Sequence, residues 1–312
     1  MLLRIGTRGS SLAVKQTLEV IDAIKRVYSG VEFELVKIRT RGDIEGSPRR
    51  IAEPGIFTKE IDLDLIKGNI DLAVHSLKDY PTKIPEGLEI AAIPRRASRR
   101  EALVSRSYRS LGEIPSGSSI GTSSMRRISH ILYHRRDLRV KRIRGNVDTR
   151  IRKVGSEVDA VILAEAGLQR LGFEGYTSID PSVITPQAGQ GALAVVARVG
   201  STASKIASLI DDPISRLETS VERGFISLLG VGCRAPIGVT AIAVGSLVRV
   251  VASLVSPDYT FGIYIDRFYD TLKAGDIVER VMKEFEALGG LELVKEWGRV
   301  STGQGDLDGD WI

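Results

Sequence analysis

Short apolar runs alternate with segments of helical periodicity between Leu2 and Arg198, and this alternation restricts the fold more than any other feature. The run LLRIG is followed by a TRGSS turn and then by apolar positions at helical spacing, namely Val14, Leu18, Ile21, Ile24 and Tyr28. The same unit of strand, loop and helix recurs along the chain. Strands that alternate with helices are typical of α/β domains. The sequence therefore predicts an α/β fold with a mainly parallel sheet.

The predicted elements fall into two sets. The first set continues with the strands VEFELVKIRT, IDLAVHS and LEIAAIP and a helix from Phe57 to Lys67, which follows a long loop rich in charge, Pro and Gly. The pattern then restarts with EALVS, SSIG, RVKRIRG and DAVILA, and helices follow SMRR and NVDT and run through EAGLQRLG. A later strand, ALAVVAR, lacks a sheet of its own. We expect the chain to cross back there and complete the first domain, so that two crossings form a hinge.

A different pattern begins after Asp212. A helix from Ile214 to Leu229 precedes a Gly-rich turn, three alternating strands reach about Phe268, and an amphipathic helix runs from Ala274 to Leu288. This order predicts a small α+β domain. The sequence thus predicts four parts: an α/β domain of residues 1–95 with 189–210, a second α/β domain of residues 96–188, an α+β domain of residues 213–300, and a flexible tail of residues 301–312.

Positive charge is concentrated in one stretch of the chain. The formal net charge is +5, yet between Ser123 and Lys153 there are nine arginines and two lysines against two aspartates. A nucleic-acid-binding protein would share this feature, but aromatic residues make up only 5% of the chain and no nucleic-acid-binding motif is present. No apolar run approaches the roughly 18 residues of a membrane span, and the N-terminus is charged. We expect a cytoplasmic protein that binds neither nucleic acid nor membrane.

The chain contains one cysteine, Cys233, in the segment LLGVGCRAPIG. A lone cysteine excludes an intrachain disulfide and a Cys-rich zinc site, and we expect no metal. Glycines and a proline place Cys233 on a turn. Most lone cysteines are buried apolar residues, and no histidine is near it in sequence to activate a nucleophile. A covalent anchor would need no such partner.

Three loops between a strand and a helix combine hydroxyl residues, Gly and Arg. They are TRGSS at 7–11, GTSSMRR at 121–127 and RGNVDTR at 144–150. Helix N-termini offer unpaired N–H groups, and arginine can bind a carboxylate through two hydrogen bonds. Ordinary helix caps beside a solvated face are the alternative interpretation of each loop. The three together favour a ligand with many carboxylates or phosphates.

The segment HSLKDYP places Lys78 and Asp79 where a predicted strand leaves its sheet, which is the usual location of ligand sites in open α/β sheets. Asp79 would be an ionised carboxylate among arginines, able to stabilise a cation or move a proton. A turn cap or an ion pair with Lys78 is the alternative.

Seven segments together resemble the porphobilinogen deaminase (hydroxymethylbilane synthase) family: RIGTRGSSLAVKQ, HSLKDYP, GTSSMRR, RGNVDTR, AEAGLQRLG, the GQGA segment at 189–192 and GCRAPIG. Their order and spacing match from about Leu3 to about Trp297. The resemblance implies two periplasmic-binding-protein-like domains hinged around a cleft and a third domain that carries the cysteine. It also implies a transferase of tetrapyrrole and haem biosynthesis (EC 2.5.1.61) that joins four porphobilinogen molecules into hydroxymethylbilane and releases ammonia.

The resemblance further implies a covalent dipyrromethane cofactor, joined through a thioether to Cys233, and Asp79 as the catalytic carboxylate. Phe57 would stack on a pyrrole ring. The other residues that match cofactor- or substrate-binding positions are Arg8, Ser10, Gln16, Ser76, Lys78, Thr122, Ser124, Arg126, Arg127, Arg144, Arg150 and Arg170.

One departure from the family pattern is visible in the loop before Phe57. The family segment GGKG is here AEPG, so Pro54 replaces a lysine. Arg49, Arg50 or Lys59 are candidate substitutes for that lysine. The alternative function is a non-enzymatic, hinged polyanion-binding protein, which would need neither Asp79 nor Cys233. We expect a monomer.

Overall fold

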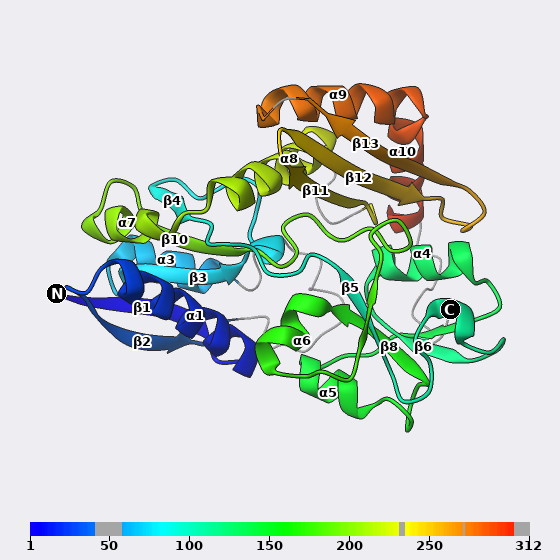
Figure 1. Ribbon diagram of the computed structural model, residues 1–312, viewed down its shortest axis with the longest axis horizontal. Helices are drawn as coiled ribbons and strands as arrows, with labels where there is room; N and C mark the ends of the chain where they lie inside the picture. The colour runs from blue at the N-terminus through cyan, green and yellow to red at the C-terminus, as the bar shows by residue number, and fades with distance from the viewer. Residues whose placement is uncertain (41–57, 231–234, 271, 303–312) are drawn as a thin grey trace. The chain divides into compact units, whose positions relative to one another are not determined.

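The computed structural model describes residues 1–40, 58–230, 235–270 and 272–302. These residues form two compact units (Figure 1). The first unit, residues 1–97 with 189–217, contains a five-stranded sheet of order β2-β1-β3-β10-β4. Its elements are β1 (Leu2–Arg8), α1 (Ser11–Val27), β2 (Glu32–Ile38), α3 (Lys59–Lys67), β3 (Leu72–Ser76), the 3-10 turn η1 (Leu77–Asp79), β4 (Leu88–Ala92), β10 (Leu193–Arg198), α7 (Thr202–Ala207) and the 3-10 turn η3 (Ser208–Ile210).

The sheet of the first unit is mixed. Strand β1 pairs in parallel with both β2 and β3, whereas β10 pairs antiparallel with both β3 and β4. The prediction of a mainly parallel sheet is confirmed, because four of the five strands run in one direction and β10 alone runs against them. Its reversal lies in the return of the chain, since β10 starts beside Ser76 at the end of β3 and runs back along that strand. The prediction that ALAVVAR completes the first sheet is confirmed.

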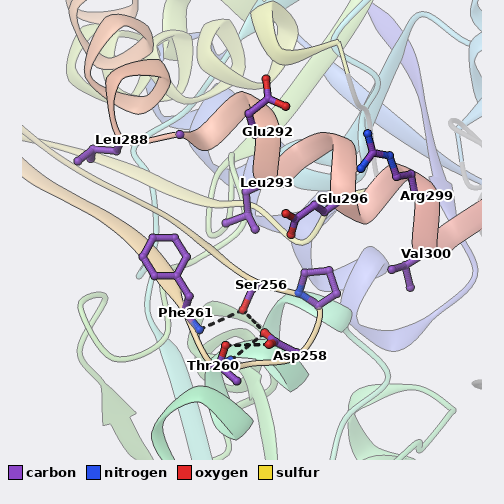
Figure 2. Close-up of a pocket in the computed structure, with 12 residues that line it drawn as sticks. Ser256, Asp258, Thr260, Phe261, Leu288, Glu292, Leu293, Glu296, Arg299 and Val300 are labelled. Atoms are coloured by element: carbon purple, nitrogen blue, oxygen red, sulfur yellow. Dashed lines mark hydrogen bonds between the residues drawn. The ribbon is translucent and has the colours of Figure 1, made fainter.

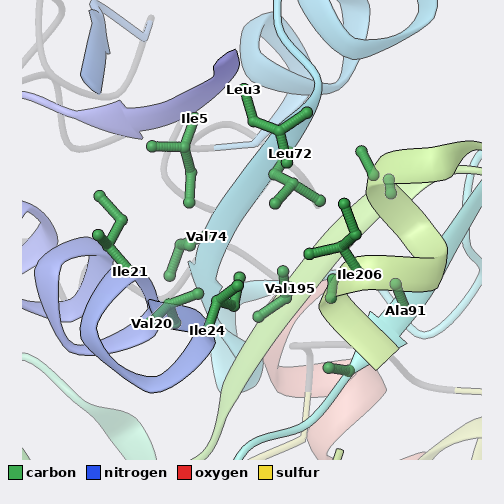
Figure 3. Close-up of a cluster of buried hydrophobic side chains, with 14 of the residues drawn as sticks. Leu3, Ile5, Val20, Ile21, Ile24, Leu72, Val74, Ala91, Val195 and Ile206 are labelled. Carbon is green, nitrogen blue, oxygen red and sulfur yellow. The ribbon is translucent and has the colours of Figure 1, made fainter. Parts of the chain in front are cut away.

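Side chains on the two faces of this sheet form separate cores. Alternate residues of β3 face opposite sides, so Leu72 and Val74 pack with the apolar residues of α1 and α7, whereas Ala73 packs with those of α3. Figure 3 shows the first of these clusters, with Ile24 of α1 and Ile206 of α7 close to the strands. Burial of both faces explains why IDLAVHS and ALAVVAR are almost continuously apolar.

The second unit, residues 98–188 with 218–312, contains a five-stranded sheet of order β7-β6-β8-β5-β9. Strand β6 is parallel to β7 and β8, and β5 is antiparallel to β8 and β9. The sequence does not predict β9, which has only three residues at the sheet edge. The elements are β5 (Glu101–Ser105), η2 (Leu111–Glu113), β6 (Ser119–Gly121), α4 (Met125–His134), β7 (Arg139–Lys141), α5 (Val147–Arg152), β8 (Ala160–Ala164), α6 (Glu165–Leu171) and β9 (Thr177–Ile179).

The C-terminal part contains a three-stranded antiparallel sheet of order β11-β12-β13 with helices. Its elements are α8 (Pro213–Leu229), β11 (Gly238–Val244), β12 (Leu247–Val255), β13 (Gly262–Tyr269), α9 (Ala274–Ala287) and α10 (Gly290–Thr302). The predicted helices and strands of this part are confirmed. Helix α10 is not predicted, because Gly289 and Gly290 suggest a helix end. It is held by Trp297, whose Nε1 donates to the carbonyl of Val255 at 2.7 Å.

None of the described helices has both the length and the apolar character needed to cross a membrane.

Candidate functional site

The carboxyl-terminal edge of the first sheet gathers several predicted site residues. Because β1 and β3 are parallel neighbours, Arg8 at the end of β1 and Ser76 at the end of β3 lie at the same edge. Ser10 is the N-cap of α1, and its side chain accepts a hydrogen bond from Ala13 N at 3.3 Å. Buried Gln16 donates from Nε2 to Ser76 Oγ at 2.9 Å. The first loop therefore caps a helix as well as contributing to this edge.

The turn η1 carries the predicted catalytic carboxylate. Asp79 is exposed, whereas Leu77 before it is buried and donates its backbone N–H to Ala192 O at 3.0 Å. Lys78 Nζ donates to Gln190 Oε1 at 3.4 Å. The turn thus presents a carboxylate and an ammonium group at the end of β3, and the segment that leads into β10 supports it.

Hydroxyl groups surround the start of α4 in the second unit. Thr122 is 1% exposed, and its Oγ1 accepts from Ser124 N at 3.3 Å. Ser123 Oγ donates to Ile143 O at 2.6 Å. Ser124 is the N-cap of α4, but its side chain makes no capping hydrogen bond. The Ser124 hydroxyl is therefore not used to cap the helix. An anion-binding site needs a hydroxyl of this kind as a donor.

Arg126 and Arg127 in the first turn of α4 are both buried and share the carboxylate of Glu101. Arg126 Nη2 donates to Oε1 at 2.5 Å, and Arg127 Nη2 donates to Oε2 at 2.7 Å. Arg126 also donates to Thr185 O, and Arg127 to Ile162 O. Burial lowers the pKa of Arg126, and the charge of Glu101 opposes this shift. Glu101 thus positions two predicted binding residues.

Sequence reasoning missed Glu101. It lies in the predicted strand EALVS, and a charged residue at the start of an apolar run is the only signal that pointed to it. Its partners are 25 and 26 residues away along the chain. Such a pairing becomes visible only when β5 and α4 are placed side by side.

Arg150 and Arg127 form a cationic pair that a carboxylate would stabilise. The pKa of Arg150 is lowered, first by burial and then by the charge of Arg127. Arg127 Nε is buried and has no hydrogen-bond partner among the described residues. Arg150 donates its Nε to Gly145 O at 2.8 Å, which leaves its Nη groups outside that bond. These donors fit a ligand that carries carboxylates.

The remaining predicted residues are dispersed along the chain, and some lie outside the described residues. Arg144 is exposed after β7, and Arg170 is half-buried in the last turn of α6. Cys233 and Phe57 lie outside the described residues, as do Pro54, Arg49 and Arg50. Lys59 begins α3. The structure therefore supplies no geometry for the predicted covalent attachment or for ring stacking.

A pocket of about 600 Å³ lies between α10 and the β12–β13 turn, and none of the predicted site residues lines it (Figure 2). Its wall includes Glu292 and Glu296, and Asp258, which bonds within the turn to Ser256 and Thr260. These three carboxylates outnumber Arg299, the one cation among the lining residues, so the pocket does not suit a polycarboxylate. Within the described parts of the chain, no cluster of three or more His, Cys, Asp or Glu is suited to a metal ion.

Comparison with known proteins connects this chain to one family. Residues 3–205 match the family model "Porphobilinogen deaminase, dipyromethane cofactor binding domain". The chain is 38% identical to the porphobilinogen deaminase of Brevibacillus brevis over 304 residues, which cover 91% of this chain and 98% of the relative. It is 39% identical to that of Thermus thermophilus over 297 residues, which cover 94% and 98%.

Solved structures also show a likeness, at a low level. The methionine-binding protein MetQ has 13% sequence identity and a TM-score of 0.43, over 67% of this chain and 89% of that chain. The periplasmic VFT2 domain of BvgS from Bordetella pertussis has 13% identity and a TM-score of 0.39, over 67% and 85%. Nothing about function follows from similarity at this level.

Proposed function

The chain belongs to the porphobilinogen deaminase family, and on this premise we propose how its residues perform the reaction of that family. The activity is that of EC 2.5.1.61: four porphobilinogen molecules are joined into the linear tetrapyrrole hydroxymethylbilane and ammonia is released. The predicted family and activity are confirmed, and the non-enzymatic alternative is set aside. The observation that carries this conclusion is the family match across residues 3–205 together with relatives that align over nearly their whole length.

The dipyrromethane cofactor of the family fits the donors of the second unit. When bound, it supplies the primer to which substrate molecules are added. Its carboxylates would be held by Arg150, by Arg127 Nε and by the Ser124 hydroxyl. Three further residues, at the same edge of the sheet or in the helices that follow its strands, would assist: Thr122, Arg144 and Arg170. Charge-assisted hydrogen bonds of this kind contribute roughly 1.5–3 kcal/mol each. Arg126 contributes through its shared ion pair with Glu101.

In this proposal, five residues at the edge of the first sheet bind substrate or cofactor carboxylates. They are Arg8, Ser10, Gln16, Ser76 and Lys78. Gln16 and Ser76 bond to each other, so they act together. Lys78 and Arg8 supply the positive charge.

Asp79 stabilises the cation that remains on the incoming pyrrole when the carbon–nitrogen bond breaks and ammonia departs with the electron pair. Its exposed position in the turn that follows β3 leaves the carboxylate accessible to substrate. A fixed negative charge lowers the barrier most when it faces charge that develops only in the transition state. Asp79→Asn should therefore retain the bound adduct yet lose turnover. Normal turnover in this variant would remove Asp79 from the mechanism.

Cys233 is the attachment point in this proposal, which rests on the match of GCRAPIG to the family motif. The intact mass of the protein should exceed the sequence mass by one two-pyrrole adduct, and Cys233→Ser should lose that excess. Phe57, by the same motif argument, stacks on a pyrrole ring. A wild-type mass equal to the sequence mass, after expression in a host that makes tetrapyrroles, would contradict covalent attachment.

Domain organisation, localisation and oligomeric state complete the proposal. We propose the two α/β domains and the α+β domain predicted above, with a hinge where the chain passes between the two α/β domains, near residues 97 and 188; the chain passes between the two compact units a third time after Leu217. The predicted tail lies outside the described residues from residue 303 on. We also propose a cytoplasmic monomer that binds porphobilinogen and no nucleic acid. Sedimentation of the holoprotein at the mass of one chain would support the monomer, and a concentration-dependent dimer would contradict it.

A further inference from the structure

Two aromatic side chains close the base of the turn that carries Lys78 and Asp79. His75 lies near the end of β3, and Tyr80 directly follows the turn. Their rings stack with centroids 5.0 Å apart and an interplanar angle of 29°. His75 is 5% exposed and Tyr80 is 3% exposed. The stack therefore joins the two ends of the turn inside the protein, on the side away from solvent.

A buried carboxylate of α3 contacts both rings. Asp62 is 4% exposed, and its Oδ1 accepts a hydrogen bond from the Tyr80 hydroxyl at 3.5 Å. The same oxygen lies 3.6 Å from His75 Nε2. A carboxylate away from water is unstable unless polar groups compensate for its lost hydration. The position of Asp62 is thus coupled to the two residues that flank the turn.

The opposite side of the turn is also constrained. The Leu77 amide bonds to Ala192 O at 3.0 Å, and a Cβ at Gly189 would lie 3.0 Å from Lys78 N. Leu77 and Tyr80 pack in one apolar cluster with Ile61 of α3. The turn is consequently held between the segment that enters β10 and helix α3. A change in the contact with α3 therefore removes one of the two supports of the turn.

We propose that Asp62 is a positioning residue: through His75 and Tyr80 it fixes the turn that presents Asp79 to the substrate. This inference rests on the catalytic role proposed for Asp79. A displacement of a reacting group by about 1 Å can lower the rate about 100-fold, even when the altered residue is remote from the chemistry. Asp62 touches neither substrate nor cofactor in this proposal, so its replacement should change turnover and leave binding nearly intact.

The test compares Asp62→Asn and Tyr80→Phe as holoenzymes. Asparagine keeps the size and one acceptor oxygen but not the charge, and phenylalanine keeps the ring stack but not the hydroxyl. The rate is expressed per mole of protein that carries the adduct, counted by intact mass. We expect kcat to fall about 10-fold or more and KM for porphobilinogen to stay within about 2-fold in both variants.

Asp71→Asn is the matched control, because Asp71 directly precedes the other end of the same strand β3. Asp71 pairs with Arg4 at 3.5 Å and with Arg198 at 3.4 Å. The control loses these ion pairs and should melt at a lower temperature with unchanged kcat. An equal loss of kcat in Asp71→Asn would overturn the inference, since the effect would then be general destabilisation.

Normal kcat in Asp62→Asn also overturns the inference, and so does a loss confined to KM. If Asp62→Asn fails to fold, Tyr80→Phe decides alone. Asp79→Asn in the same assay separates the two proposals. Full turnover there refutes the catalytic role of Asp79, whereas loss there with full turnover in Asp62→Asn refutes only the positioning role of Asp62.

Discussion

Replacement of Glu101 by glutamine would test how two arginines that we propose for cofactor binding are held. Glu101 is 0% exposed, and Arg126 and Arg127 are each 6% exposed. One carboxylate oxygen accepts from each arginine, at 2.5 Å and 2.7 Å. The glutamine amide retains one acceptor oxygen and turns an NH2 group toward the second guanidinium. Both buried arginines therefore lose their shared counter-charge, and one of them faces a donor.

Removal of one partner from a buried ion pair costs about 3–5 kcal/mol, because the other charge stays buried without compensation. For folded units of roughly 150–250 residues, each kcal/mol lowers the Tm by about 2–4 °C. We therefore expect the Tm of Glu101→Gln to fall by about 10 °C. The retained adduct should also decrease, since Arg127 would no longer be held toward the ligand.

Thermal unfolding followed by circular dichroism, together with the intact mass of the purified protein, measures both effects. Glu292→Gln is the control, because Glu292 pairs with Lys295 at 2.8 Å on the surface of α10. Its Tm should equal that of the wild type, since exposed ion pairs stabilise proteins little. A Glu101→Gln protein that melts within about 2 °C of the wild type would refute the reasoning.

Two further predictions follow from the same structure. Burial lowers the pKa of His130 to about 3, so between pH 6.5 and about pH 3 the unfolded state binds a proton that the folded state does not. Stability should be full above pH 6.5 and fall by about 1.4 kcal/mol per pH unit below it, and urea unfolding of His130→Gln should lack this slope. Gly189→Ala should lower both Tm and kcat, because Gly189 has φ 74° and an added Cβ would press on Lys78 N. Gly200→Ala, at φ 68° with open space around it, should lower Tm alone, and equal kcat losses would contradict this difference.

The positions of the loops proposed to bind anions could be predicted because each depends on a short stretch of chain. The segment GTSSMRR contains a strand end, hydroxyl residues and the first helical turn within seven residues. The structure places β6 before Thr122 and starts α4 at Met125. What each arginine contacts could not be predicted. Arg126 and Arg127 belong to the Arg-rich stretch of the chain. Both side chains nevertheless point inward and pair with the carboxylate of Glu101, which lies on strand β5.

Sequence alone determined the alternation of strands and helices, the segments of the proposed site, and the match to one family. These features depend on hydrophobic periodicity and on turn residues within about ten to twenty positions of the chain. Neighbouring side chains are therefore enough to determine them. Tertiary structure alone decided that β10 runs antiparallel, that Glu101 pairs with two arginines, and that Asp62 contacts the base of the Asp79 turn. Each of these depends on which distant segments pack together. Local preferences leave that choice open, and the burial of apolar faces on both sides of a shared sheet decides it.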